Sequence, residues 1–227
     1  MRFFVTGTDT NVGKTEVAAA LLGMMSARGH SAFAFKPYES GVSDLGSPTD
    51  AVRLLHAAGG AQPLDTVSLF RFRRPLAPGI AAHLERRPTD WAKTLRTYRG
   101  FRSPWGVVEG AGGLFVPLDA RHDVIDLISA LAIPVVLVAR AGLGTINHTV
   151  LSLEALRARS LKVAAVVLNA TTAQPEPSAK SNAQELRRRF PRLIILGPTR
   201  FLKGERRRDA MLRRMLQPLG EVAVDVF

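Results

Sequence analysis

The sequence predicts a single-domain α/β protein with a doubly wound, mainly parallel sheet. Segments with strand and helix character alternate along the whole chain, as expected when right-handed crossovers connect parallel strands. Residues 134–139 and 161–168 are apolar on both faces, which is typical of strands in the middle of a parallel sheet. No stretch marks a domain boundary, so residues 1–227 are expected to form one domain.

The composition is that of an ordinary globular protein. The chain has 227 residues, of which 46% are hydrophobic, and it contains no cysteine. The lack of cysteine excludes disulfides, thiolate metal sites and a cysteine nucleophile. Charges, glycine or proline interrupt every apolar run well short of a membrane span, and strand character begins too early for a targeting peptide. We therefore expect a cytoplasmic protein with no membrane partner.

The net charge of +12 allows two interpretations. A basic patch binds nucleic acid in many proteins, because phosphates attract lysine and arginine. Alternatively, the basic residues lie on solvated helix faces, and much of the excess falls in residues 187–189, 203–208 and 213–214. No aromatic residues alternate with these arginines, as a surface for single-stranded nucleic acid would require. We favour solvated helix faces and expect no nucleic-acid partner.

The first elements expected are a strand over residues 2–6 and a helix over residues 15–28. The helix carries an apolar stripe at helical spacing and stops at a glycine, which is common just after helix ends. A second strand covers residues 31–35. Pro37 cannot continue a central strand, so Lys36 is expected at the carboxyl end of this strand.

The remaining elements follow from the same periodicities and from glycine and proline breaks. Up to residue 132 they are a loop over residues 39–48, a helix over 50–58 capped by Thr49, a strand or extended segment over 66–72, helices over 80–85 and 90–98, a strand over 105–108 and a helix over 123–132. After the strand at 134–139 come a helix from Thr145 to about residue 159, the strand at 161–168, a loop over 171–181, a helix over 183–190, a strand over 193–196 and a basic helix over 206–216.

The turn between the first strand and the first helix reads GTDTNVGKT from Gly7 to Thr15. Strand, glycine-rich turn and helix form the context of a phosphate-binding loop, in which backbone N–H groups and the positive end of the helix dipole face the anion. Lys14 can reach the β- and γ-phosphates, and the Thr15 hydroxyl can bind Mg²⁺. One residue more than the standard spacing separates Gly7 from Gly13, which indicates a subclass of such loops. We favour a nucleotide site over a merely capped helix.

Polar residues follow several of the expected strands, and these are Lys36, Glu109 and Asn169. The carboxyl ends of parallel strands share one edge of a sheet, so these side chains are expected to meet the phosphate loop. Glu109, together with Asp50, could bind Mg²⁺ held on the phosphates. Lys36 could stabilise the charge that develops as a phosphoryl group transfers. Asn169 could read an adenine edge through its amide.

Each of these residues also has a simpler interpretation. Glu109 and Asn169 could be turn residues after strands, and Lys36 could be a solvated lysine at a strand end. Asp50 could be an ordinary first-turn acid, which the helix dipole favours. The convergence of all four on one edge favours the functional interpretation.

A set of motifs in this chain resembles the dethiobiotin synthetases. In family order they are residues 4–15, KPYESG at 36–41, the helix that begins near Asp50, PLAP at 75–78, VEGAGGLFVP at 108–117 and LGTINHT at 143–149. The resemblance runs from residue 4 to residue 169, and it implies a fold of the P-loop NTPase type.

The resemblance also implies a role for each matching residue. Lys36 is implied as the catalytic lysine, and Lys14 and Thr10 as its neighbours around the transferring phosphoryl group and the carbamate. The implied nucleotide contacts are Asn11, Val12, Gly13, Lys14, Thr15, Glu16, Asp50, Glu109, Gly110, Ala111, Gly112 and Asn169. The implied Mg²⁺ ligands are Thr15, Asp50 and Glu109, and the implied substrate contacts are Thr10, Ser40, Leu143, Gly144 and Asn147.

The reaction implied by the resemblance closes the ureido ring of dethiobiotin from 7,8-diaminononanoate, CO₂ and ATP, with Mg²⁺ as cofactor. The family acts as a homodimer, in which the helix N-terminus near Leu143 would meet the carboxylate tail of substrate bound mainly by the partner subunit. The chain departs from the family pattern at residues 197–200 and at Ala170, so the preferred nucleotide base stays open.

Three other classes of protein share some of these features. A partition-type ATPase switch carries a second lysine early in the loop, near Thr8, and this chain has none there. A glutamine-dependent amidoligase needs an added domain with a cysteine nucleophile. A nucleic-acid-binding module would rest on the net charge alone. The partition-type switch is the main alternative to a synthetase.

Overall fold

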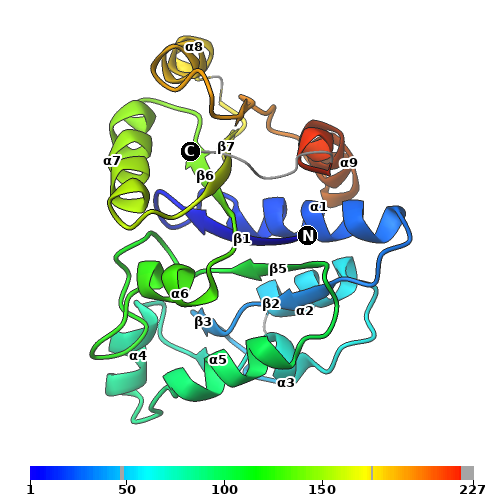
Figure 1. The fold of residues 1–227 in the computed structure, drawn as a ribbon, viewed down its shortest axis with the longest axis vertical. Coiled ribbons are helices and arrows are strands. Elements are labelled where there is room, and N and C mark those ends of the chain that lie inside the picture. The colour runs from blue at the N-terminus through cyan, green and yellow to red at the C-terminus, as the bar shows by residue number, and fades with distance from the viewer. Residues whose placement is uncertain (47–48, 175, 221–227) are drawn as a thin grey trace.

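A six-stranded sheet forms the centre of the computed structural model, which describes residues 1–46, 49–174 and 176–220. The strand order is β2-β5-β1-β6-β7-β8, and every neighbouring pair is parallel (Figure 1). The sheet strands are β1 Arg2–Gly7, β2 Phe33–Phe35, β5 Gly106–Glu109, β6 Val135–Arg140, β7 Val163–Asn169 and β8 Ile195–Leu196. The predicted α/β class and parallel sheet are confirmed.

Helices alternate with these strands along the chain, as predicted. They are α1 Lys14–Ala27, α2 Thr49–Ala57, α3 Leu64–Val67, α4 Pro78–Leu84, α5 Trp91–Gly100, α6 Val124–Leu131, α7 Thr145–Ala158, α8 Ala179–Arg189 and α9 Glu205–Leu216, followed by a short 3₁₀ helix, Gln217–Gly220. Among the described residues, none of these helices has both the length and the apolar composition needed to cross a membrane.

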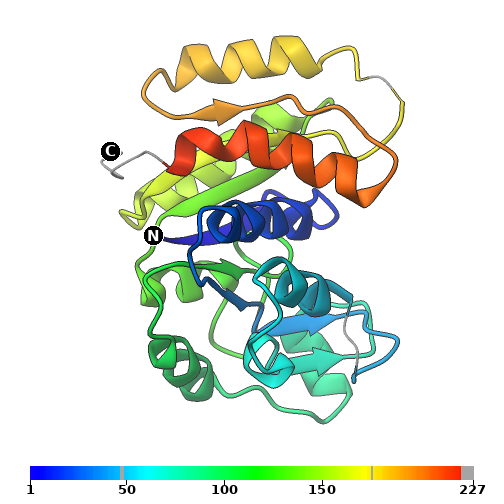
Figure 2. The same ribbon diagram turned by 90° about the vertical axis from the view of Figure 1, so that its right-hand side faces the viewer.

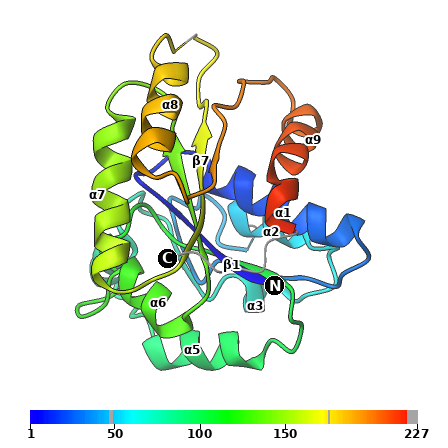
Figure 3. The same ribbon diagram turned by 45° about the horizontal axis from the view of Figure 1, so that its top comes forward.

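Both faces of the sheet are covered by helices (Figure 3). Helices α1, α2 and α9 pack on one face, and α5, α6, α7 and α8 pack on the other. Successive strand residues point to opposite faces, so Phe3 and Val5 join the first layer while Phe4 joins the second. A sheet buried on both sides explains why the strand sequences are almost continuously apolar.

A second, two-stranded sheet was not expected. Strands β3 Tyr38–Ser40 and β4 Phe70–Phe72 pair in parallel beside the main sheet. The prediction of a loop from residue 39 is therefore wrong at its start, and the end of that loop, at 47–48, lies outside the described residues. The predicted strand over 66–72 begins only at Phe70, because residues up to Val67 belong to α3. Strands of three residues are too short to show a period in the sequence.

The other differences concern element ends. Helix α8 begins at Ala179 rather than at residue 183, so the predicted loop over 171–181 is shorter, and its Pro175 lies outside the described residues. The remaining elements lie within a few residues of their predicted bounds, which is the usual uncertainty of helix and strand ends.

The carboxyl ends of the strands form one edge of the main sheet, and the turns after β1 and β5 lie there. The strand order reverses around β1, because the chain first builds β2 on one side of it and later β6 to β8 on the other. Ligands bind at such a reversal in open α/β sheets. Helix α9, near the end of the chain, lies beside α1 and so reaches the same region (Figure 2).

Candidate active site

The phosphate-binding loop joins β1 to α1, and its backbone requires special residues at two positions. Gly13 has φ +93°, and a Cβ atom there would lie 2.1 Å from Nδ2 of Asn169. Asn11 also has a positive φ, of 58°, which asparagine tolerates better than most residues. Helix α1 then begins at Lys14, so its first N–H groups face the loop.

Lys14 is buried at the centre of the loop. Its Nζ donates a hydrogen bond to the carbonyl oxygen of Asp9 at 2.9 Å. Burial lowers the pKa of the Lys14 ammonium to about 8; the Glu109 carboxylate opposes this shift and the Lys36 ammonium adds to it. The lysine is therefore held by the loop itself, and no carboxylate among the described residues forms an ion pair with it.

Lys36 is held between two carboxylates. Its Nζ lies 2.6 Å from Oε1 of Glu109 and 2.7 Å from Oδ2 of Asp50. Burial alone would lower the pKa of the Lys36 ammonium, but Glu109, Asp50 and Glu39 outweigh burial and raise that pKa above its usual value. Lys36 therefore keeps its positive charge and is suited to neutralise anions rather than to accept a proton.

Glu109 and Thr15 form the part of the site that suits a divalent cation. The Thr15 hydroxyl donates to Oε1 of Glu109 at 2.8 Å, whereas Oε2 of Glu109 is buried with no hydrogen-bond partner among the described residues. Hydroxyl and carboxylate oxygens are the ligands that Mg²⁺ takes beside substrate phosphates. Within residues 1–46, 49–174 and 176–220, no three His, Cys, Asp or Glu side chains gather into a metal cage. The donors present fit Mg²⁺ that draws its other ligands from phosphates and water.

Asp50 reaches the site from the first turn of α2, and Glu39 on β3 fixes that turn. Oε1 of Glu39 accepts the backbone N–H of Asp50 at 3.0 Å, and Oε2 accepts that of Ala51 at 3.3 Å. Burial raises the pKa of Glu39, although the Lys36 ammonium opposes the shift. Burial would also raise the pKa of Asp50, but Lys36 outweighs burial and lowers it. Asp50 is therefore an ionised carboxylate in a fixed position.

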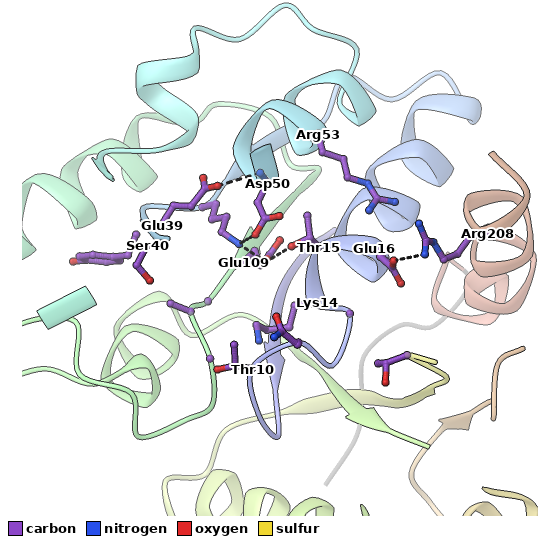
Figure 4. A pocket seen from close by; sticks show the side chains of 18 of the residues that line it. Thr10, Lys14, Thr15, Glu16, Glu39, Ser40, Asp50, Arg53, Glu109 and Arg208 are labelled. Carbon is purple, nitrogen blue, oxygen red and sulfur yellow. Dashed lines mark hydrogen bonds and ion pairs between the residues drawn. The ribbon is translucent and has the colours of Figure 1, made fainter. Parts of the chain in front are cut away.

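These groups line one cavity of about 400 Å³, seen from close by in Figure 4. The predicted site residues among its lining are Thr10, Asn11, Gly13, Lys14, Thr15, Glu16, Lys36, Ser40, Asp50, Glu109, Gly110, Ala111 and Gly112. The structure thus brings together residues from the phosphate loop, from the ends of β2 and β5, and from α2. The cavity combines two lysines with several carboxylates and hydroxyls, a set that can bind a polyanion together with a cation.

Asn169 lies beneath the phosphate loop and outside the cavity lining. Its Nδ2 donates to the carbonyl oxygen of Val12 at 3.0 Å, and its Oδ1 accepts from the Thr199 hydroxyl at 2.9 Å. The amide therefore joins the loop to the segment after β8, and Val12 is likewise buried. Each end of an amide can form one further hydrogen bond, so base reading by Asn169 stays a prediction.

The other predicted substrate contacts lie apart from the cavity. Leu143, Gly144 and Asn147 are exposed at the turn before α7 and in its first turn. Gly144 has φ +86° and immediately precedes α7, whose first residue, Thr145, is buried.

Several cavity residues were missed by sequence reasoning. They are Tyr38, Glu39, Arg53, Thr171, Phe201 and Arg208, whereas Ala170, which also lines the cavity, was noted as a departure from the family pattern. Arg53 follows Asp50 by three residues on α2, so helical spacing could have placed it on the same face. Arg208 lies far along the chain in the predicted basic helix and has no local signal. Its contact with the cavity corrects the prediction that this helix only presents solvated arginines.

The parallel sheet, its strand reversal and the loop from Gly7 to Thr15 together define a protein of the P-loop NTPase class. A family model described as an AAA domain matches residues 1–199. The chain belongs to the ATP-dependent dethiobiotin synthetase family, whose members are enzymes of biotin biosynthesis. This membership confirms the resemblance read from the motifs and favours the synthetase over the partition-type switch.

Two relatives illustrate the range of similarity. The ATP-dependent dethiobiotin synthetase BioD of Anaeromyxobacter dehalogenans is 50% identical over 187 residues, which cover 82% of this chain and 83% of the relative. The enzyme of the same name from Bacillus subtilis subsp. natto is 34% identical over 199 residues, or 87% and 86% of the two chains. A solved nucleotide-binding protein in complex with ADP from Archaeoglobus fulgidus has a TM-score of 0.51 at 12% identity, covering 100% of this chain and 92% of that one. This last similarity supports the fold alone.

Proposed function

We propose that this protein closes the ureido ring of dethiobiotin from 7,8-diaminononanoate and CO₂, with conversion of ATP to ADP and phosphate. The proposal rests on family membership and on one observation above all. A charged lysine, Lys36, is fixed between two carboxylates in the same cavity as the phosphate loop. That arrangement suits a reaction in which an anionic acceptor takes a phosphoryl group from ATP.

The reaction begins without ATP. One amine of the diamine adds to CO₂ and loses a proton, which gives a carbamate. A carbamate oxygen then attacks the γ-phosphorus of ATP, and ADP leaves. The second amine attacks the carbonyl carbon of the resulting carbamic–phosphoric anhydride and closes the ring as phosphate departs. Phosphorylation is needed because an unactivated carbamate has no good leaving group.

In this proposal the two lysines bracket the transferring group. Lys14 lies on the nucleotide side and Lys36 on the carbamate side, and both stabilise negative charge in the transition state. The hydroxyls of Thr10 and Ser40 line the same cavity and orient the carbamate or the diamine. The raised pKa of Lys36 supports its role as a permanent cation.

Thr15, Asp50 and Glu109 are the residues that would hold Mg²⁺. When bound, the ion would neutralise part of the phosphate charge. Asn11 to Glu16 and Gly110 to Gly112 would contact the nucleotide, and Asn169 its base. Asn169 would do so with the N–H donor and the oxygen lone pair that its bonds to Val12 and Thr199 leave free.

We further propose a homodimer in which the turn before α7 meets substrate bound by the partner subunit. Leu143, Leu151 and Phe115 support this proposal, because large apolar side chains that are 82%, 61% and 62% exposed suit an interface. The first turn of α7 would offer its N–H groups to the substrate carboxylate. The partners we propose are the small-molecule substrates and a second copy of the chain. We propose no nucleic-acid or membrane partner, and we place the protein in the cytoplasm.

The direct test compares ADP release with and without diaminononanoate and bicarbonate in the presence of Mg²⁺. We expect release to depend on both substrates, and Lys36→Ala to lower it by about a hundredfold or more. Lys180→Ala, at an exposed position on α8, removes the same charge elsewhere and should leave the rate unchanged. ATP hydrolysis by folded protein at an equal rate with and without the diamine would refute the proposed function.

A further inference from the structure

The basic helix α9 contributes one arginine to the nucleotide cavity. Arg206 and Arg207 are exposed, but Arg208 turns inward and lines the cavity. Its side chain points toward Glu16 (Figure 4), with Nη1 2.8 Å from Oε1 of Glu16. Only 23% of the Arg208 side chain is exposed. Arg208 therefore belongs to the site and not to the solvated face of α9.

Glu16 is an unusual partner, because it stands where a nucleotide would bring negative charge. It lies in the first turn of α1, two residues after Lys14, and also lines the cavity. The helix dipole favours an acid in this turn when the protein is alone. A phosphate group held by the same turn would repel the carboxylate unless a cation stood beside both. Arg208 is the cation in contact with Glu16.

The Arg208 guanidinium has further N–H donors that could bind a second anion. A guanidinium carries five N–H donors in a fixed fork. Among the described residues, only Nη1 of Arg208 has a side-chain acid partner, and its Nε is buried with no hydrogen-bond partner. The part of the Arg208 side chain that is exposed lines the cavity, so its remaining N–H groups can meet a ligand oxygen there. Hydrogen bonds between a guanidinium and a phosphate are among the strong ones.

Other contacts hold the backbone of Arg208 in place. Arg53 of α2 pairs with Glu205 at 2.9 Å and with Asp209 at 3.0 Å, on either side of Arg208 along α9. Leu212 and Leu216 are fully buried against α1 and its layer. The Nε atoms of Arg53 and Arg208 are both buried without a well-aligned hydrogen bond. Among the described residues, however, Arg53 pairs with two acids and Arg208 with one, so Arg208 is the better candidate for a ligand contact.

We propose that Arg208 binds a phosphate oxygen of the nucleotide directly, while Glu16 holds its guanidinium at the rim of the loop. The inference rests on the proposed use of this cavity for ATP. It assigns to the C-terminal helix a nucleotide contact that the phosphate loop itself does not supply.

The test measures ADP binding by titration calorimetry for the full chain, wild type and variants. Arg208→Gln should weaken ADP binding by about tenfold to a hundredfold, as expected for a hydrogen bond between charged groups. Arg207→Gln removes the same charge from the neighbouring exposed position and should stay within about twofold of wild type. Thermal unfolding of both variants checks that α9 remains docked.

A second pair of variants separates direct contact from simple neutralisation of Glu16. In a Glu16→Gln background the carboxylate is gone, so a purely neutralising Arg208 would have no further effect. We expect Arg208→Gln to weaken ADP binding at least about fivefold in that background too. Loss of the effect there, an equal effect of Arg207→Gln, or unchanged binding in Arg208→Gln overturns the inference. Absence of ADP binding by wild type would instead refute the proposed function.

Discussion

The charged residues of the site depend on one another for their protonation states. Lys36 is buried, and it stays charged because Glu109 and Asp50 lie within 2.7 Å of its Nζ. Removing one member of such a buried network leaves the others with an uncompensated charge, which costs more than the pair contributes when it is intact. Under the proposed role of Lys36, a substitution there would change both activity and stability, so a loss of activity must be read beside a measure of folding.

Gly13 offers a sharper test of the loop geometry. Gly13→Ala should destabilise the protein by about 1–2 kcal/mol for its positive φ, and further because its Cβ would collide with Asn169. The affinity for ADP should also fall in Gly13→Ala, because the phosphate-binding loop must move to relieve the collision. The matched control is Gly29→Ala, since Gly29 has φ +79° but nothing within 4 Å of a Cβ. Urea unfolding and ADP titration compare the two, and equal losses in both variants would contradict the role of the Asn169 contact.

At the scale of elements, strand β3 and helix α2 form one unit that positions Asp50. Glu39 caps the N-terminus of α2 with both carboxylate oxygens, so two otherwise unpaired N–H groups are satisfied. The cap comes from a strand outside the main sheet. The second sheet therefore positions Glu39 against the first turn of α2.

Glu39→Ala should leave those N–H groups unpaired and lower the free energy of unfolding by about 2 kcal/mol. We also expect a higher Mg²⁺ concentration for half-maximal ADP release, because Asp50 loses its fixed position. Asp90→Ala serves as the control, since Asp90 caps α5 through the N–H of Lys93 at 2.7 Å, away from the cavity. Its unfolding cost should be about 1 kcal/mol. A Mg²⁺ requirement that shifts equally in both variants would argue against positioning by Glu39.

Asp119, in the loop before α6, makes a pH-dependent contribution to the free energy of unfolding. Burial would raise the pKa of Asp119, but the backbone N–H groups of Arg121 and His122 and the His122 ring outweigh burial and lower it. A carboxyl with a lowered folded pKa stabilises the protein above its unfolded pKa, and this contribution is lost as pH falls through the folded value. Asp119→Asn should therefore cost about 1 kcal/mol at neutral pH. Unfolding measured from about pH 5 to about pH 2 should show the difference shrinking below the ordinary value of 3.8. A constant difference would contradict this assignment.

At the scale of the molecule, the sheet fixes where the site lies and what remains exposed. The cavity occupies the strand reversal, while the turn before α7 stands clear of it with Leu143 outward. If a second copy covers this turn, Leu143→Asp should convert a dimer to a monomer, because it would place a charge in an apolar contact. Sedimentation should show the change, and the KM for the diamine should rise about tenfold. ADP affinity should stay the same. A wild-type protein that sediments as a monomer would exclude the proposed interface.

The sequence predicted the main sheet and the centre of the site because both leave local signals. Apolar strands ending in Lys36, Glu109 and Asn169 could be placed on one edge, and the loop motif supplied Lys14 and Thr15. The short strand Tyr38–Ser40 could not be predicted, since its pairing with Phe70–Phe72 depends on tertiary contacts. The pair of Glu16 and Arg208 could not be predicted either, because it links helices α1 and α9, which lie far apart in the sequence. Polar side chains that meet only in the folded protein leave no periodic pattern in the sequence.

The most direct test of the proposed reaction traces the carbon atom of CO₂ into the product. Purified protein is incubated with ATP, Mg²⁺, 7,8-diaminononanoate and ¹³C-bicarbonate, and the products are analysed by mass spectrometry beside an ADP assay. The account predicts dethiobiotin that carries the label in its ureido carbonyl, formed in equal amount to ADP. ADP formed without labelled dethiobiotin, at a rate indifferent to the diamine, would contradict it.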